Sequence, residues 1–276
     1  MIRLTALMDD KPSEHLKLAT EHGLSFYMEA GGKKLLFDCD ATGATLSNAR
    51  NLGIRLDHLD AVVLSHSHYD HSAGYRALIE SGLGNCVLFT GPLFFERKYA
   101  KDESRLKDLS CGFDCRFLSE HGIQYCQIES VAEIFPGIWL LSGFKRTHAF
   151  EIIPARFVRQ TGGRVVQDEF PDEICLAVQV NGGLAVLVGC SHPGILNIIS
   201  HVRETLNQPV RMVFGGTHLL DADEKRVRQT IGELKSLGLK VLGLSHCSGE
   251  AADCMIRNDP EIFGRHLATG DTTYFE

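Results

Sequence analysis

One short run of polar residues constrains this chain more than any other feature: the apolar stretch Ala61–Leu64 leads directly into Ser-His-Ser-His-Tyr-Asp-His. A short stretch of branched apolar residues predicts a buried strand, and residues two apart on a strand point to the same side. His66 and His68 can therefore reach one metal ion where the strand ends. Asp70 and His71 come next, and a tight turn there would direct a carboxylate oxygen and another imidazole towards a neighbouring ion.

Chance is a poor explanation for this run. The chain has 13 histidines among 276 residues, so three histidines and an aspartate within six positions are improbable without a cause. Without a metal, four polar side chains would have to be solvated or buried at a strand end, and burial of unpaired polar groups is costly. The run therefore indicates a metal site.

Further histidines come after two later apolar stretches, as a site that needs ligands from several loops requires. His192 lies in Gly-Cys-Ser-His-Pro-Gly after Leu184–Val188, and His246 lies in Ser-His-Cys-Ser-Gly after Val241–Leu244. We expect both side chains to complete the metal shell. The alternative is that either histidine caps a helix or lies in the core.

The composition is that of an ordinary soluble protein, with 44% hydrophobic and 23% charged residues. No linker-like or low-complexity tract divides the sequence, so we expect a single domain over residues 1–276. The formal charge of −7 is spread along the chain and gives no basic field for phosphate backbones, so general nucleic-acid binding is not expected. The N-terminal residues do not resemble a signal peptide and no stretch approaches about 20 apolar residues, so we expect a cytoplasmic protein that does not associate with membranes.

The nine cysteines are scattered without the spacing of a disulfide framework, and we expect most of them to be reduced and buried. Cys111 and Cys115 are separated by three residues, but no second such pair exists, so a structural zinc knuckle is disfavoured.

Short strand-like stretches and helix-like stretches occur in two successive halves. In the first half we predict strands at Ser25–Met28, Lys34–Phe37 and Ala61–Leu64 and a helix at Ala44–Leu52. In the second half we predict strands at Ile138–Leu141, Ile174–Val180, Leu184–Val188, Val210–Phe214 and Val241–Leu244, with helices at about 193–203 and at Asp223–Leu237. Two mixed halves predict a layered α+β sandwich with the sheets inside and the helices outside.

The stretch from 91 to 133 has no clear periodicity and carries several aromatic residues among charges. We expect an irregular or helical insertion there. Its aromatic side chains either pack on the core or cover a site, and the sequence does not separate these alternatives.

The motifs together resemble those of the metallo-β-lactamase superfamily. His66-x-His68-x-Asp70-His71 is similar to its signature, and Leu36-Phe37-Asp38 is similar to an earlier motif of that superfamily. Within the superfamily, the chain resembles the branch of 7,8-dihydropterin-6-methyl-4-(β-D-ribofuranosyl)aminobenzene-5′-phosphate synthase-like proteins, and this resemblance extends over nearly the whole chain. The motifs that carry it are Glu21-His-Gly-Leu-Ser25, Gly189-Cys-Ser-His-Pro-Gly-Ile195, Gly215-Gly-Thr-His-Leu219 and His246-Cys-Ser-Gly249.

This resemblance implies a four-layer αββα sandwich with a binuclear metal centre in the cleft between its sheets. It assigns one ion to His66, His68 and His192 and the other to Asp70, His71 and His246, with Asp38 supporting the metal loop from behind. Cys190 stands where many members of the superfamily have a bridging aspartate, and a thiolate ligand is one alternative there. Many members also have a separate earlier histidine, for which His148 is a possible match.

Three further features are candidates for substrate binding or support. His218 in its Gly-Gly-Thr-His turn either binds substrate or phosphate, or caps the following helix. The basic cluster Lys145, Arg146 and His148 suits an anionic group, although a solvated loop explains it equally well. His22 is expected, with the neighbouring glutamate, to brace the metal loop.

These residues favour a metal-dependent hydrolase that uses two divalent ions, zinc before iron or manganese, on a small anionic ester or phosphodiester. Asp70 would bind metal and orient the attacking water. Two alternatives stay open: the transferase chemistry of the synthase-like branch, and a di-iron redox or sensor protein. A homodimer is compatible with the sequence.

Overall fold

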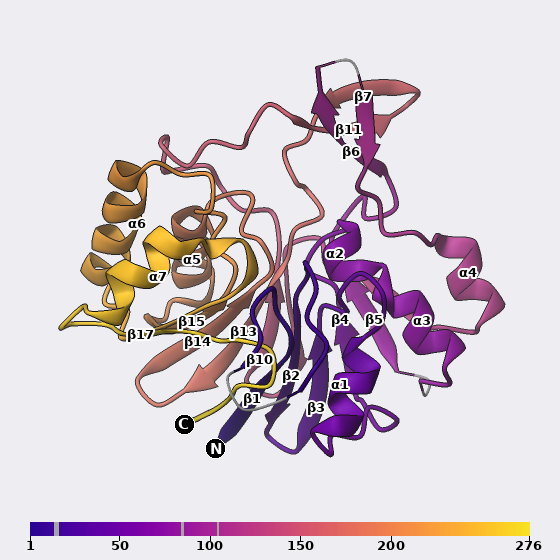
Figure 1. Cartoon of the computed structure of the whole chain (residues 1–276), viewed down its shortest axis with the longest axis horizontal. Coiled ribbons are helices and arrows are strands. Elements are labelled where there is room, and N and C mark those ends of the chain that lie inside the picture. Colours follow the sequence, from indigo (N-terminus) through magenta and orange to yellow (C-terminus); the bar gives the residue numbers. More distant parts are fainter. Residues whose placement is uncertain (14–16, 84–85, 104) are drawn as a thin grey trace.

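The computed structural model describes residues 1–13, 17–83, 86–103 and 105–276. These residues form two large sheets packed face to face, with helices on both outer faces and a small sheet beyond one end (Figure 1). The four-layer αββα sandwich predicted from the sequence is confirmed.

The first large sheet combines the N-terminal strands with the last strand of the chain. Strands β3, β4, β5 and β8 run parallel, whereas β18, β1, β2 and β3 pair antiparallel. The strand order is β18 (Thr272–Phe275), β1 (Ile2–Met8), β2 (Ser25–Ala30), β3 (Lys33–Phe37), β4 (Ala61–Val63), β5 (Val87–Thr90) and β8 (Tyr125–Gln127).

The second large sheet comes from the second half of the sequence. Strands β14 to β17 are parallel, and β9, β10, β13 and β14 pair antiparallel. The order is β17 (Phe263–His266), β16 (Val241–Leu244), β15 (Val210–Gly215), β14 (Gly183–Val188), β13 (Cys175–Val180), β10 (Ile138–Leu141) and β9 (Val131–Phe135).

The inner faces of the large sheets enclose the central core, which includes Phe26, Phe37, Leu140, Leu187 and Phe214. Alternate residues of the same strands point outward and pack under the helices, because side chains on a strand alternate between faces. The helices on the first sheet include α1 (Thr45–Asn51) and α3 (Gly74–Glu80), and those on the second are α5 (Ile195–Leu206), α6 (Glu224–Ser236) and α7 (Glu250–Arg257). No helix in the described part of the chain is long and apolar enough to cross a membrane.

The segment from 91 to 133 was expected to be an irregular or helical insertion, but most of its regular structure is β-strand. Residue 104 lies outside the described residues. The segment contains β6 (Arg97–Asp102), β7 (Arg105–Asp108) and a short helix α4 (Cys115–Glu120), and then β8 and the start of β9. Strands β6 and β7 pair with β11 (Phe157–Thr161) and β12 (Arg164–Gln167) to form the small sheet, in the order β12-β11-β6-β7. Strand β7 is exposed along its whole length, so it carries no apolar alternation that a sequence pattern could detect.

The small sheet stands over the edge where the parallel strands of both large sheets end (Figure 1). The loops after β3, β4, β14, β15 and β16 emerge at this edge, and two of them continue as α2 (Tyr69–Ser72) and the short 3₁₀ helix η1 (His246–Ser248). In sheets of this kind, loops at the carboxyl ends of parallel strands are where ligands bind.

Candidate metal centre

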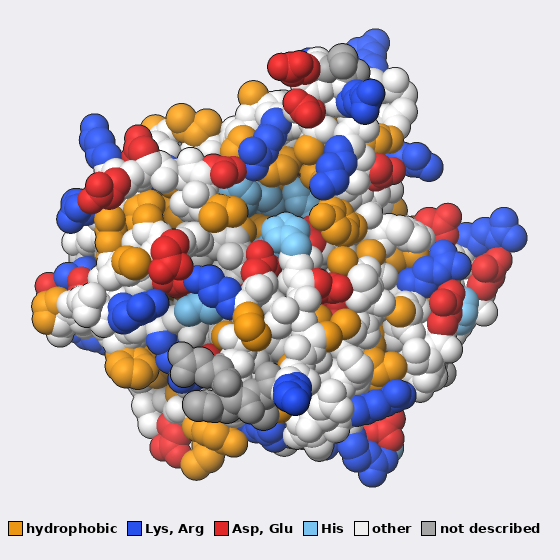
Figure 2. Space-filling model, viewed as in Figure 1, with side chains coloured by type: hydrophobic (Ala, Val, Ile, Leu, Met, Phe, Trp, Pro, Cys, Tyr) orange, Lys and Arg blue, Asp and Glu red, His pale blue; other side chains and the backbone are white. Residues whose placement is uncertain are grey.

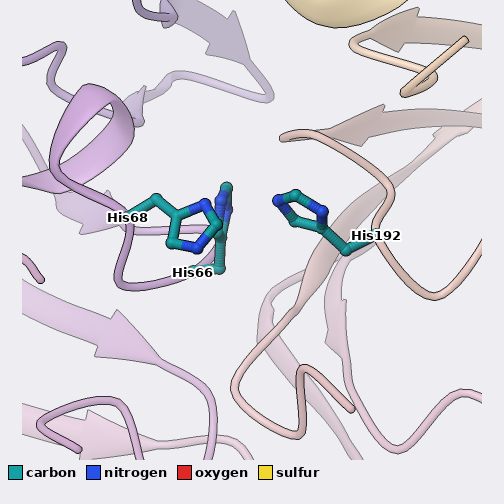
Figure 3. A group of neighbouring side chains, drawn as sticks. All are labelled: His66, His68 and His192. Carbon is teal, nitrogen blue, oxygen red and sulfur yellow. The ribbon is translucent and has the colours of Figure 1, made fainter. Parts of the chain in front are cut away.

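Three imidazoles meet at this edge from the two large sheets. His66 and His68 extend from the loop after β4, His192 extends from the loop after β14, and their rings face one another (Figure 3). One nitrogen of each ring lies within 4.8 Å of the others, and all three side chains are buried. This is an arrangement that a single metal ion can occupy.

Several nitrogen atoms of this group are free to bind a metal because they lack hydrogen-bond partners. Nε2 of His66 and both ring nitrogens of His192 have no hydrogen-bond partner among the described residues. Burial lowers the pKa of His66, His68 and His192 well below that of an ordinary histidine, so the rings are neutral and carry lone pairs. Because orphaned polar atoms are costly in a protein interior, a bound cation is the simplest way to satisfy them.

A second group lies beside the first and contains Asp70, His71 and His246. Asp70 Oδ2 is 3.3 Å from Nε2 of His246 and 3.9 Å from Nε2 of His71. Burial raises the pKa of the Asp70 carboxyl, but the hydrogen bond with His246 and the neighbouring imidazoles outweigh this effect and hold the pKa well below its usual range. The carboxylate is therefore ionised and available as a hard oxygen ligand.

Asp38 holds both groups in place from behind the metal loop. Its Oδ1 accepts a hydrogen bond from the Ser65 backbone N–H at 2.7 Å, and its Oδ2 accepts from the Ser65 hydroxyl at 2.8 Å and lies 2.6 Å from Nδ1 of His71. The contact on Nδ1 turns Nε2 of His71 towards the site. Gly189 makes room for this network, since a Cβ there would lie 2.1 Å from the Ser65 hydroxyl.

Cys190 lies between the two groups. Its Sγ is 3.1 Å from Nε2 of His71, and it also falls within 4.8 Å of ligand atoms of His66, His246 and Cys247. The structure thus places a thiol at the position where the sequence departs from the bridging aspartate of many superfamily members. Cys247 was not among the residues expected from the sequence, although its place directly after His246 was a usable signal.

His22 also reaches the second group, with Nε2 3.3 Å from Asp70 Oδ2. Its Nδ1 is 3.0 Å from Oδ2 of Asp10, whose other carboxylate oxygen is 2.7 Å from Nδ1 of His246. Asp10 was not expected at the site from the sequence. The available signal was its position after the apolar run that forms β1, because β1 ends at the same edge as β3.

Side chains from both groups, His68 and His192 from the first and Asp70 and His246 from the second, line a cavity of about 490 Å³ between the large sheets and the small sheet. His218 lines this cavity, with its ring centroid 4.5 Å from that of His192. Three cations also line it, Lys101 and Lys107 from the small sheet and Arg156 just before β11. Figure 2 shows histidine side chains gathered in a hollow with lysine and arginine side chains around its rim.

His148 is not part of this site, and the hypothesis that it provides the separate histidine ligand is wrong for this structure. Its backbone N–H donates to Oδ1 of Asn197 at 2.8 Å, and its Nε2 is 3.4 Å from a carboxylate oxygen of Glu233 on α6. Glu151 accepts hydrogen bonds from the first backbone N–H groups of α5, which ties the 147–151 segment to that helix instead of the cavity. His192 occupies the place next to His66 and His68.

The rest of the expected basic cluster also faces away from the cavity. Lys145 lies 4.0 Å from Glu204, and Arg146 lies 3.6 Å from Glu169. The positive charge near the metal groups comes from the small sheet and its flank, where the sequence predicted no strand. Cys111 and Cys115 are free thiols, one buried and one exposed, and belong to none of the ligand groups in the described residues.

Comparisons with known proteins agree with this geometry. Residues 19–82 match the model of the metallo-beta-lactamase superfamily. The chain is 31% identical over 272 residues to the 7,8-dihydropterin-6-methyl-4-(beta-D-ribofuranosyl)-aminobenzene-5′-phosphate synthase of Methanocaldococcus jannaschii, an alignment that covers 94% of this chain and 91% of the relative. The chain belongs to the metallo-β-lactamase superfamily.

Solved structures give the same family. The fold superposes on Tm1679, described as a metal-dependent hydrolase of the beta-lactamase superfamily, with a TM-score of 0.84, 27% identity and complete coverage of both chains. A diphosphatase of the PhnP family superposes with a TM-score of 0.53 and 14% identity over 100% of this chain and 98% of the other. The second likeness concerns the fold alone. The metallo-β-lactamase fold suggests divalent-metal binding, and the His/Asp groups of this chain are the candidate sites for it.

Proposed function

We propose that this protein is a metal-dependent hydrolase that cleaves an ester or phosphodiester in a small anionic substrate. The observation that carries the proposal is the shared cavity: both His-rich groups contribute side chains to its lining, with Cys190 between them. We further propose that His66, His68 and His192 hold one divalent ion and that Asp70, His71 and His246 hold the other. Imidazole-rich donors favour zinc, with iron or manganese as the other candidates.

When bound, a pair of such ions lowers the pKa of water towards about 7 and polarises the bond under attack. The chain's own residues then have separate tasks. Asp70 faces the cavity and can accept a hydrogen bond from the attacking water, which orients it. His218 is neutral because burial lowers its pKa, and it can hydrogen-bond the leaving group from the other side of the cavity.

The cationic side chains at the rim of the cavity support the proposal that the substrate is an anion. Lys101 and Lys107 form no ion pair with any other residue that the structure describes, whereas Arg156 lies 2.7 Å from Asp221. The overall charge of −7 opposes an incoming anion, so local cations are needed to attract one. Unpaired lysines beside the metal groups can do this for a phosphate or carboxylate.

A second candidate is a transferase reaction in which an arylamine ribotide displaces a leaving group from a pterin and loses a proton, so that the two are joined. The identity to the archaeal synthase over nearly the whole chain favours it. The cationic rim serves this candidate equally, since the ribotide carries a phosphate that need not be the reacting group. In that case the metal groups would act on the bond-forming centre and the rim would hold the phosphate.

Parallel assays separate the two candidates. Protein loaded with zinc, manganese or iron is tested on phosphodiesters, lactones and thioesters, beside a dihydropterin-plus-arylamine-ribotide condensation. The proposal expects metal-dependent hydrolysis that falls by orders of magnitude in Asp70→Ala. Condensation without hydrolysis would replace the hydrolase with the transferase.

A further inference from the structure

Asp10 joins two imidazoles that come from distant parts of the chain. One carboxylate oxygen is 3.0 Å from Nδ1 of His22, and the other is 2.7 Å from Nδ1 of His246. A carboxylate can only accept, so both Nδ1 atoms must donate. When each ring is neutral, its lone pair therefore lies on Nε2, on the side of Asp70.

Both Nε2 atoms approach the same carboxylate oxygen. Oδ2 of Asp70 is 3.3 Å from Nε2 of His22 and 3.3 Å from Nε2 of His246. The ring centroids of these two histidines are 4.6 Å apart. His22 and His246 therefore make the same two contacts, with Nδ1 against Asp10 and Nε2 against Asp70.

The backbone next to His22 is packed directly on Asp70. The N–H of Leu24 donates to the Asp70 carbonyl at 3.2 Å, and a Cβ on Gly23 would lie 2.6 Å from that oxygen. This close approach, which only glycine permits, fixes where the His22 side chain begins. The position of His22 beside Asp70 is therefore set by the backbone, although its side chain is about half exposed.

We propose that His22 is a further ligand of the ion held by Asp70, His71 and His246, and that Asp10 positions His22 and His246 for that ion. The inference rests on the proposed binuclear centre. It assigns the second ion one carboxylate and three imidazoles, a donor set suited to zinc, iron or manganese. A carboxylate that orients a metal-bound imidazole through its other nitrogen is a recurrent feature of such sites.

The test measures metal binding, not turnover. The apoprotein, prepared with a chelator, is titrated with Zn²⁺ in competition with a chromophoric chelator, and with Co²⁺ while the visible absorption is recorded. The variants are His22→Ala, His22→Gln and Asp10→Asn. The control is His58→Ala, which removes another exposed histidine that contacts Arg55 instead of the metal groups.

We expect all variants to keep the first ion and His58→Ala to keep both. His22→Ala and His22→Gln should bind the second ion about 10–100-fold more weakly, in the range found when residues around metal sites are changed. Asp10→Asn should do the same, because an amide can accept from one Nδ1 only and must donate to the other, which moves that ring's proton to Nε2. The cobalt absorption of the second site should change in the His22 variants.

Two other outcomes have distinct meanings. If His22→Ala binds both ions with wild-type affinity and an unchanged cobalt spectrum, His22 is not a ligand and the inference fails. If the unmodified protein binds fewer than two ions, the binuclear centre itself is wrong. Circular dichroism of the apoproteins checks folding, which these changes at the cavity rim should leave intact.

Discussion

The Phe170 ring stacks on the imidazole of His192, with centroids 3.8 Å apart and planes only 12° from parallel. The ammonium of Lys98 lies over the same Phe170 ring, 4.4 Å from its centroid. Lys98 is fully buried and pairs with Asp168 at 2.8 Å and Asp172 at 2.5 Å. Asp172 also accepts a hydrogen bond from the backbone N–H of Ser67 at 2.9 Å, between His66 and His68. A buried ion cluster on the small sheet thus supports the first ligand group from two sides.

Removal of Lys98 should therefore destabilise the protein strongly. Lys98→Met leaves two buried carboxylates without their cation, and breaking a buried pair in this way costs about 3–5 kcal/mol. Urea unfolding measures the change, with Lys101→Met, on an exposed neighbour of the same strand, as a control near zero. A loss below about 1 kcal/mol for Lys98→Met would contradict the role of this cluster.

The two ligand groups should be separable by mutation. His192→Ala and His246→Ala should each remove about one ion per chain while the fold persists, because the histidines come from different loops and contact different groups. Elemental analysis after gel filtration gives the count. His148→Ala is the matched control, since its ring contacts α5 and α6, and it should keep both ions. Full metal content in either of the first two variants would reassign that ligand.

Cys190 should add a thiolate ligand to the imidazole and carboxylate donors of the two groups. Its Sγ lies 3.1 Å from His71 Nε2, between the two groups, and a thiol that coordinates a metal ion is deprotonated. The Co²⁺-loaded protein should show a sulfur-to-cobalt charge-transfer band in the near ultraviolet that is absent in Cys190→Ser and retained in Cys254→Ser, where an exposed thiol is removed. An identical band in Cys190→Ser would assign it to the neighbouring Cys247.

The cavity rim should govern affinity for the anionic substrate. Lys107→Ala or Arg156→Ala should raise KM about 10–100-fold, as expected for loss of a charge-assisted hydrogen bond of about 1.5–3 kcal/mol, with metal content unchanged. Lys145→Ala, on the basic cluster that faces away from the cavity, is the control. If KM responds only to Lys145, the anion binds elsewhere.

The contact between His266 on the second sheet and Asp9, just after the N-terminal strand, should make the stability of the fold depend on pH. Burial lowers the pKa of His266, but hydrogen bonds to Asp253 and Asp9 outweigh it and raise the pKa to about 9. A group whose pKa is raised on folding stabilises the fold below its unfolded value, near 6.5, and this contribution is lost as pH rises through about 9. Unfolding free energy should therefore fall between about pH 6.5 and 9 by up to about 3 kcal/mol. His266→Gln should flatten this slope, and an equal slope in that variant would show that another group causes it.

Much of the candidate ligand set could be predicted from the sequence because the information is local. An apolar strand that leads into His66 and His68, and later strands that lead into His192 and His246, identify strand ends that share one edge of a layered sheet protein. Asp70 and His71 lie in the same loop as the first pair. A few consecutive residues therefore indicate the strand, the point where it ends and the type of candidate ligand that follows it.

The tertiary structure alone decided which distant residues complete the site. Asp10 contacts His246 only because the end of β1 in the first sheet lies against the end of β16 in the second, a relationship of sheet packing that no local pattern encodes. Two rim cations, Lys101 and Lys107, come from β6, which is only partly buried, and from β7, which is exposed throughout, so these short strands show no apolar periodicity that distinguishes them from a loop. His148 matched the separate histidine ligand in residue type and in its order along the chain, but a hydrogen bond to Asn197 near the start of α5 holds it away from the cavity. Local sequence determines where a strand ends and which side chains come next, whereas contacts between elements far apart in the chain depend on how the whole core packs.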